Sequence, residues 1–365
     1  MRLLYLTDAM AVHGGIERVL TDKINWLAEN TGFNVYLLTV DQGKNDVVFS
    51  LHPNVIYQDL GVFFFKQYNV PMWRRWSIRR RLHRLFQQSL KEKISEIEPD
   101  VIIFTRLDYI QDLEKVNGKI PLVFESHSSC LSSVFEHDCL LRQVSIWYQK
   151  KALRNVNAVV ALTEGDAAEW KKRINNVFVI PNVVQLNSAG CICNRESRSI
   201  IYIGRDSVQK DLDSLINMWK IVFQKHPDWN LHIYGKTRRF SSGVVVHEPK
   251  SNMDDAYINA SLLVLTSLYE PFGLVLPEAM SYGMPVVAFD CPYGPAEIIT
   301  DGVDGYIIKN RNLMEFANRV CQFIEDVNMR VRMGNAGIQS SQRYRAAIIM
   351  PQWINLFEKI VDNSI

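Results

Sequence analysis

The sequence predicts an α/β protein of two domains, each with a parallel β-sheet that helices cover on both faces. Short apolar runs rich in β-branched residues alternate with helical stretches along the 365 residues, an order that is typical of parallel sheets. The alternation stops once, at a polar stretch over residues 182–199, and then restarts. The chain length also favours two domains of roughly 150 to 200 residues each.

The first half contains six short apolar runs that we expect to be strands. We expect helices between most of them, at residues 17–29, 76–97 and 139–153. The expected strands are residues 3–6, 34–40, 55–60, 101–105, 122–125 and 158–162.

The second half repeats this alternation after the polar stretch, which we interpret as an interdomain linker. A helix is expected at residues 211–225, and strands at 199–203, 231–234, 262–266, 285–289 and 306–309. The last segment has apolar residues at helical spacing, so it must bury this stripe on another surface. The stripe consists of Ile348, Trp353, Leu356, Phe357 and Ile360.

Composition excludes several classes of protein. Lysine and arginine total 41 against 39 acidic residues, a net charge of +2 that argues against a uniformly basic nucleic-acid binder. The hydrophobic content of 47% is too high for a disordered chain. Asp8 interrupts the apolar N-terminal run too early for a signal peptide. We therefore expect the mature protein to start at Met1 and to stay in the cytoplasm.

A glycine pair follows the first expected strand. Gly14 and Gly15 stand between that strand and the helix expected at 17–29. Glycines let the backbone approach a ligand closely, and a helix N-terminus offers free N–H groups to an anion. Because no G-x-G-x-x-G pattern occurs, the segment does not favour nicotinamide or flavin binding. A plain strand-to-helix turn explains the pair equally well.

Two cations follow the first strand of the second domain. Arg205 comes directly after Gly204, and Lys210 lies five residues further on. A guanidinium fork and an ammonium at this spacing suit a diphosphate, although two solvated surface cations would have the same pattern. Asp211 and Asp213 form a D-x-D string, but acidic residues are common in the first turn of a helix. We predict no metal site, because Arg205 and Lys210 already supply positive charge.

The most specific pattern runs from Glu270 to Glu278, after the strand expected at 262–266. A helix is expected to begin near residues 272–274, with Pro277 tolerated in its first turn. Its N–H groups and dipole would face an anion. Two carboxylates do not suit the anion itself, but they suit hydroxyl groups on either side of it, such as those of a sugar and a ribose. A capping loop with two solvated acids is the alternative.

At this point the sequence resembles a known family. The string from Glu270 to Glu278 resembles the E-x7-E motif of glycosyltransferase family 4. The resemblance covers essentially the whole chain and is weakest between residues 40 and 120, where acceptor recognition usually varies in that family. Further matching segments are Gly14-Gly15, Pro181-Asn182, Gly204-Arg205 with Lys210, and residues 294–305.

The resemblance implies the GT-B fold, in which two Rossmann-like domains with parallel sheets face each other and a C-terminal helix crosses back to the N-terminal domain. The N-terminal, acceptor-side domain would be residues 1–181, completed by the helix at 345–365. The C-terminal domain, residues 182–344, would bind the nucleotide-sugar donor. The apolar stripe of the last helix would then pack on the first domain.

The resemblance also implies a retaining, metal-independent transfer from a nucleotide sugar, without a cofactor. Glu278 would bind the ribose hydroxyls, and Glu270 would contact the hydroxyls of the donor sugar. Arg205 and Lys210 would hold the diphosphate and stabilise the negative charge of the leaving group.

Further residues would complete the donor site. Gly14 and Gly15 would approach the donor from the first domain, and Phe272, Gly273 and Leu274 would surround it in the second. His127, which follows the strand at 122–125, resembles a family histidine that reaches the donor sugar. A structural histidine at the end of a strand is the alternative, because a single histidine is a weak motif.

Residues 66–93, here called the basic segment, carry nine cations and one acid, so their net charge is +8 and the rest of the chain carries −6. In one interpretation its apolar stripe packs on the sheet and its arginines face solvent. In the other, arginines and tryptophans contact an anionic membrane. RNA binding is disfavoured because no stacking motif accompanies the charge. The membrane side would include Arg74, Arg75, Arg79, Arg80, Trp73 and Trp76, and the expected stripe is Ile78, Leu82, Leu85, Phe86, Ile94 and Ile97.

The predicted function is the transfer of a hexose or N-acetylhexosamine from a nucleotide-diphosphate sugar to a glycan acceptor in surface polysaccharide synthesis. UDP is the preferred nucleotide, and the acceptor is expected to be linked to a polyprenyl diphosphate. The enzyme would act at the cytoplasmic face of the inner membrane as a peripheral protein. The alternatives are a GT-B epimerase or nucleotide-sugar hydrolase, and a scaffold subunit that has lost catalysis.

Overall fold

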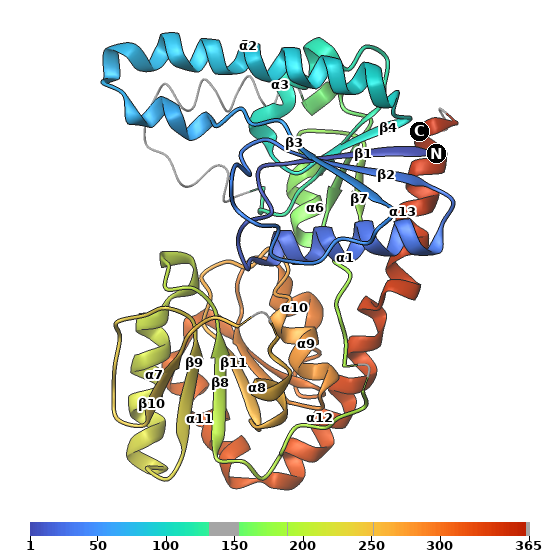
Figure 1. The fold of residues 1–365 in the computed structure, drawn as a ribbon. Coiled ribbons are helices and arrows are strands. Elements are labelled where there is room, and N and C mark those ends of the chain that lie inside the picture. Colours follow the sequence, from blue (N-terminus) through green and yellow to red (C-terminus); the bar gives the residue numbers. More distant parts are fainter. Residues whose placement is uncertain (131–152, 188, 251, 363–365) are drawn as a thin grey trace. The chain divides into compact units, whose positions relative to one another are not determined.

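The computed structural model describes residues 1–130, 153–187, 189–250 and 252–362. The chain divides into two compact units. The first comprises Met1–Ile180 and Met350–Ile365, and the second comprises Pro181–Ile349. Each unit contains one sheet of parallel strands with helices around it (Figure 1). The predicted α/β fold class is therefore confirmed. The helix expected at 139–153 lies almost entirely outside the described residues.

The sheet of the first unit has seven strands in the order β3-β2-β1-β4-β5-β6-β7. All of its pairings are parallel, and the six predicted strands are present with bounds that shift by about one residue. β7 was not predicted, because three half-buried residues carry too short a pattern. The strands are β1 (Arg2–Thr7), β2 (Asn34–Thr39), β3 (Val55–Asp59), β4 (Val101–Phe104), β5 (Leu122–Glu125), β6 (Ala158–Ala161) and β7 (Val177–Val179).

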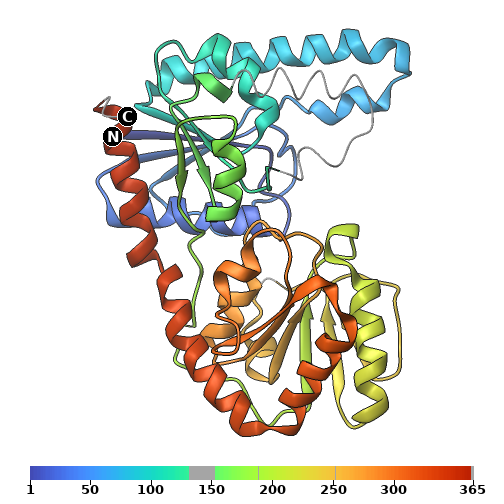
Figure 2. The ribbon, with the colours of Figure 1, turned by 180° about the vertical axis from the view of Figure 1, so that it is seen from behind.

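Helices cover both faces of this sheet, with α2 and α3 on one face and α1 on the other (Figures 1 and 2). The first unit also contains α6 and most of α13. Four members of the predicted apolar stripe of α13 are buried, from Trp353 to Ile360, but the prediction was wrong at Ile348, which is 40% exposed. The helices are α1 (Gly15–Asn30), α2 (Met72–Ile97), α3 (Ile110–Val116), α6 (Glu164–Lys171) and α13 (Ala346–Val361). Short 3-10 turns are η1 (Phe64–Asn69), η2 (Leu107–Tyr109) and η3 (Leu153–Asn155).

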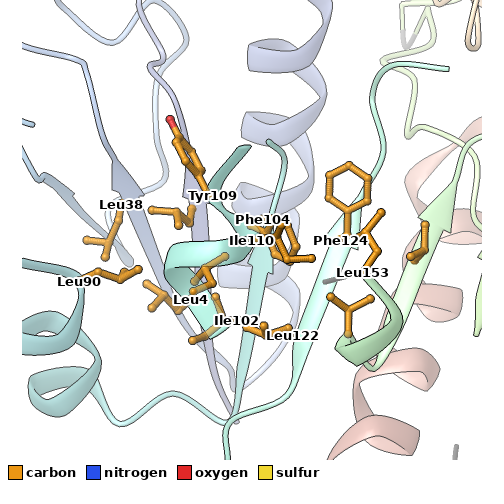
Figure 3. Packing of buried hydrophobic residues seen from close by; sticks show 14 of the residues in the cluster. Leu4, Leu38, Leu90, Ile102, Phe104, Tyr109, Ile110, Leu122, Phe124 and Leu153 are labelled. Atoms are coloured by element: carbon orange, nitrogen blue, oxygen red, sulfur yellow. The ribbon is translucent and has the colours of Figure 1, made fainter. Parts of the chain in front are cut away.

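The core beneath α2 shows how this helix packs. Leu82, Phe86 and Leu90, spaced by four residues, belong to the same buried cluster as the sheet residues Leu4 and Ile102. Figure 3 shows Leu90 in this cluster, near Leu4 and Leu38. The expected stripe was wrong at Leu85, which is 44% exposed. Leu90 takes a place in the stripe instead. The four-residue spacing explains the difference, because each buried side chain of this row stands one turn beyond the last.

The sheet of the second unit has six strands in the order β10-β9-β8-β11-β12-β13. All of the pairings are parallel, and five of the strands were predicted. The exception is β10, a four-residue strand whose side chains are half-buried or exposed. The strands are β8 (Ser199–Ile203), β9 (Asn230–Tyr234), β10 (Val244–His247), β11 (Leu262–Leu265), β12 (Val286–Phe289) and β13 (Gly305–Ile308).

The core of the second unit lies between this sheet and two amphipathic helices. Trp219 of α7 and Phe316 of α11 are fully buried there against Tyr202 and Phe289. The helices are α7 (Leu212–Lys225), α8 (Asp254–Ile258), α9 (Val275–Ser281), α10 (Gly294–Ile298), α11 (Leu313–Glu325) and α12 (Val327–Ser341). The 3-10 turns are η4 (Val208–Lys210), η5 (Lys309–Arg311) and η6 (Gln342–Tyr344).

Each sheet has a point where the strand order reverses. In the second unit this point lies between β8, the first strand in chain order, and its neighbour β11. Ligands of open parallel sheets bind beyond the carboxyl ends of the strands at such a switch point. The loops that follow β8 and β11 are therefore the first place to look for a site.

Candidate active site

The loops after β8 and β11 bring two of the predicted residues into contact. Lys210 ends the short turn after β8, and Glu270 follows β11. Lys210 Nζ lies 2.5 Å from Glu270 Oε2. The two side chains are 19% and 10% exposed, so the pair is largely sheltered but reaches the surface. An ammonium on a flexible side chain that is held in this way can turn to an incoming anion.

The backbone around Glu270 is fixed by a neighbouring loop. Its N–H donates to the carbonyl of Pro292 at 2.6 Å, and its own carbonyl accepts from the N–H groups of Tyr293 and Gly294. Ser267 Oγ lies 3.1 Å from the same carboxylate oxygen that contacts Lys210. These contacts leave Glu270 little freedom, which is the property that a residue aimed at a substrate needs.

The loop between the two glutamates turns sharply before α9. Gly273 has a φ of +97°, a conformation that favours glycine. A Cβ on Gly294 would lie 1.8 Å from the carbonyl oxygen of Phe272, so only glycine fits between the two loops. The helix begins at Val275 with Leu274 as its N-cap, later than the expected start at residues 272–274. The turn at Gly273 is the reason for the later start.

Glu278 lies in a separate environment from Glu270. It is 6% exposed on α9, and its Oε2 accepts a hydrogen bond from Tyr257 Oη of α8 at 2.6 Å. The ring of Tyr257 stacks on that of Tyr282 at a centroid distance of 5.1 Å. The structure thus surrounds the two glutamates with different partners, as two distinct roles require.

Arg205 differs from Lys210 in its surroundings. It is exposed directly after β8 and forms no ion pair with any residue of the described segments. The adjoining Asp206 is held by Arg239, which also contacts Asp213 on α7 at 2.8 Å. This bridge fixes the loop that carries Arg205 and leaves its guanidinium exposed to solvent.

Arg311 is a residue of this site that the sequence analysis missed. It stands after β13 and donates to the carbonyl oxygens of Ser267 at 2.9 Å and Thr266 at 3.0 Å. It also forms an ion pair with Asp211, the residue next to Lys210. One guanidinium thus ties the loop after β8 to the loop after β11. The position of Arg311 just after the predicted strand at 306–309 is the sequence signal that could have identified it as a site residue.

Asp211 itself differs from the expected first-turn residue. It is the N-cap of α7, has a φ of +44° and accepts a hydrogen bond from the N–H of Ser214. Thr266 Oγ1 donates at 3.1 Å to the carbonyls of both Lys210 and Asp211. Within the described residues, no group of three or more potential ligands could hold a metal ion.

In the first unit, the predicted residues also stand at carboxyl ends of strands. Gly14 is the N-cap of α1, and Gly15 begins this helix, in the connection that follows β1. His127 follows β5 and its side chain is 4% exposed. Its Nε2 lies 3.3 Å from Oε1 of Glu125. Their roles in donor binding remain predictions.

The basic segment includes most of α2, the long helix at the top of Figure 1. Its first three turns bury no side chain, and Met72, Trp73 and Trp76 are 79%, 75% and 70% exposed. Arginines lie over the aromatic rings: Arg74 over Trp73 at 4.6 Å, and Arg80 over Trp76 at 5.3 Å. Two further arginines of the segment, Arg75 and Arg79, are also exposed.

The described part of the chain has no helix that is both long enough and apolar enough to span a bilayer.

Two family models match the chain. The model of Glycosyltransferase Family 4 matches residues 13–188, and that of Glycosyl transferases group 1 matches residues 193–340. An uncharacterized glycosyltransferase of Haemophilus influenzae is 24% identical over 93% of this chain and 95% of its own. The amylovoran biosynthesis glycosyltransferase AmsD of Erwinia amylovora is also 24% identical, over 96% of this chain and 98% of its own.

A solved structure has the same fold. TarM of Staphylococcus aureus, in complex with Fondaparinux, alpha-GlcNAc-glycerol and UDP, superposes with a TM-score of 0.79. The match covers 98% of this chain and 99% of TarM, at 15% sequence identity. The chain is therefore an enzyme with the GT-B fold. It is a glycosyltransferase of the family 4 type, and the predicted family, fold and enzyme class are confirmed.

We predict that Arg311→Ala lowers the free energy of unfolding of the second unit by about 1–3 kcal/mol, because two carbonyls and Asp211 lose a charged donor. Urea titration followed by tryptophan fluorescence measures this loss. Arg319→Ala is the matched control, because the two arginines have similar exposure and each lies over an aromatic ring. The Arg319 side chain is 35% exposed and its Cζ lies 4.4 Å from the ring centroid of Tyr306. The Arg311 side chain is 30% exposed and its Cζ lies 4.3 Å from the ring centroid of Phe289. Equal losses in the two variants would show that the bridge between the loops contributes nothing.

Proposed function

We propose that the protein is a retaining, metal-independent glycosyltransferase that uses a nucleotide-diphosphate sugar, preferably a UDP-sugar. The acceptor is a glycan, linked to a polyprenyl diphosphate, in the synthesis of a bacterial surface polysaccharide. The transferred sugar is a hexose or an N-acetylhexosamine. The enzyme works as a peripheral protein on the cytoplasmic face of the inner membrane.

The contact between Lys210 and Glu270 carries this proposal. It places a cation for a diphosphate next to a carboxylate for sugar hydroxyls, at the switch point of a parallel sheet. The exposed Arg205 also follows β8 and supplies a second cation. Glu278, buried against Tyr257, offers a carboxylate for ribose hydroxyls. A donor that is both a phosphate ester and a glycoside needs this combination of charges.

The chemistry follows from these groups. The bond between the anomeric carbon of the donor sugar and the diphosphate oxygen breaks, and a bond from an acceptor hydroxyl oxygen to that carbon forms. The hydroxyl proton is transferred to the departing diphosphate. Negative charge grows on the phosphate oxygens as the bond breaks, and Arg205 and Lys210 stabilise it. Glu270 orients the sugar, and its contact with Lys210 holds the ammonium in place until the donor arrives.

The comparisons support the choice of donor and pathway. TarM was solved with UDP bound, and AmsD is named for the biosynthesis of amylovoran. The match to AmsD covers nearly the full length of both chains, as does the match to TarM, and this supports the same donor and pathway here.

The exposed start of α2 supports contact with a membrane. Met72, Trp73 and Trp76 expose apolar surface beside several arginines, the combination found in helices that lie at the lipid–water interface. Each cation near an anionic surface contributes up to about 1 kcal/mol. A protein bound to a membrane in this way would meet a lipid-linked acceptor at the same surface.

A panel of nucleotide sugars tests the proposed function. We expect slow hydrolysis of at least one UDP-, GDP- or dTDP-sugar, at a rate that EDTA does not change. Release of free nucleotide is measured by a coupled assay, and binding by calorimetry. A donor that is isomerised rather than cleaved would favour the epimerase. Absence of both turnover and binding for every donor would contradict the proposal, and a loss of turnover in EDTA would contradict the metal-independent mechanism.

We predict that Arg205→Ala and Lys210→Ala each reduce kcat by about 100-fold or more, the usual effect of removing a group that stabilises transition-state charge. Lys220→Ala is the control, because Lys220 is an exposed lysine on α7 of the same unit. The rate is measured with the best donor of the panel at saturating concentration. An unchanged rate in either site variant would remove that residue from the site.

For the membrane surface, we expect the wild type to float with vesicles that contain phosphatidylglycerol and not with pure phosphatidylcholine. The Arg79→Ser/Arg80→Ser/Arg81→Ser variant should bind up to about 100-fold more weakly, at up to about 1 kcal/mol per cation. An Arg154→Ser/Lys171→Ser/Lys172→Ser variant removes the same charge from exposed positions elsewhere in the first unit. Equal flotation of the two triple variants would rule out a specific role of α2.

A further inference from the structure

The first unit buries a charged side chain that the proposed chemistry does not use. Lys23 lies on α1 and its side chain is 1% exposed, the only fully buried lysine among the described residues. Its ammonium contacts Glu125 at the end of β5, 102 residues away in the sequence, and that side chain is 2% exposed. Lysine and glutamate are almost never buried to this extent unless they are paired.

Aromatic rings enclose the ammonium. Nζ of Lys23 lies 4.0 Å from the ring centroid of Trp353 and 5.1 Å from that of Tyr5. Tyr5 is on β1 and Trp353 is on α13, so the charge contacts segments from the start, the middle and the end of the chain. Cations over aromatic faces are attracted to them, and more so when water is excluded.

The carboxylate of Glu125 has two neighbours. One oxygen contacts Lys23, and the other lies 3.3 Å from Nε2 of His127. Burial would raise the pKa of Glu125, but its interactions with Lys23 and His127 outweigh burial and lower this pKa to about 2. The carboxylate is therefore ionised at neutral pH. It connects a buried cation to the histidine that the sequence analysis placed at the donor sugar.

Stability alone does not explain this arrangement. Two buried charges lose their hydration, and a pair of apolar side chains of similar size is often as stable or more so. An apolar pair would fill the same space between α1, β5 and α13. It would not place a negative oxygen beside the imidazole of His127.

We propose that Lys23 and Glu125 are positioning residues that hold His127 in the orientation that recognition of the donor sugar requires. Trp353 covers the ammonium, so the C-terminal helix completes this buried cluster. The proposal rests on the proposed function for the role of His127. The pair itself touches no substrate, and acts through the placement of the imidazole.

The test uses the full-length protein and separates positioning from folding. Lys23→Met and Glu125→Met alone each leave a buried charge without its partner, so each should lower Tm by several degrees. The Lys23→Met/Glu125→Met double variant removes both charges and should recover most of this loss. We expect its kcat to remain reduced by about 10-fold or more, since small displacements of a positioned group have effects of this size. KM for the donor should change less than kcat.

A second measurement does not need turnover. The ¹⁵N signals of the His127 ring, assigned by their loss in His127→Gln, should shift or broaden in the double variant because the neighbouring carboxylate is gone. The control is Lys172→Met/Glu169→Met, which removes a surface ion pair of 2.6 Å and should leave rate and signals unchanged. If the double variant does not fold, Lys23→Met/Glu125→Gln removes both charges and retains a side chain of the same size as Glu125.

The outcomes are distinguishable. A stable double variant with wild-type kcat and unchanged His127 signals would overturn the proposal and leave the pair a structural role only. Wild-type protein without turnover of any donor would contradict the proposed function, whereas the His127 signals would still decide whether the pair positions the ring. A reduced kcat together with altered His127 signals supports the positioning role.

Discussion

The parallel pairing of β8 with β11 is the constraint on which the candidate active site depends. It places the loops after these strands side by side, although about sixty residues of chain separate them. Lys210 and Glu270 meet only because of this pairing. Arg311 then ties the two loops together from the end of β13. The site that we propose for a nucleotide sugar thus lies at the carboxyl ends of strands in a rigid sheet, which limits its motion.

The two units differ in how deeply their lysine–glutamate ion pairs are buried. In the second, the pair of Lys210 and Glu270 reaches the surface, where the cation can exchange its partner for a ligand. In the first, Lys23 and Glu125 are closed off by aromatic rings, where no ligand can replace either partner. The exposed pair suits binding and charge stabilisation, and the closed pair suits the fixing of a neighbour. Burial decides which of these roles an ion pair can perform.

Charge is distributed unevenly along the chain. The net charge of +2 combines a segment of +8 with a remainder of −6. Within α2, the part that begins at Leu82 buries Leu82, Phe86 and Leu90, while the ten residues before it bury no side chain. One helix therefore both completes the core and presents a surface. The packed part of α2 holds its exposed start in place.

The sequence by itself determined the fold class, most strands and the positions of the chemical groups, because each depends on local patterns of apolar, glycine and charged residues. Half-buried strands such as β7 and β10 escaped prediction, since their patterns are short and weak. Only the tertiary structure showed that Arg311 bridges two loops and that Lys23 is buried beside Glu125. No motif of the sequence singled out either residue. Their roles depend on partners far along the chain. Only the pairing of strands within each sheet, and the packing of helices on it, bring those partners within contact distance.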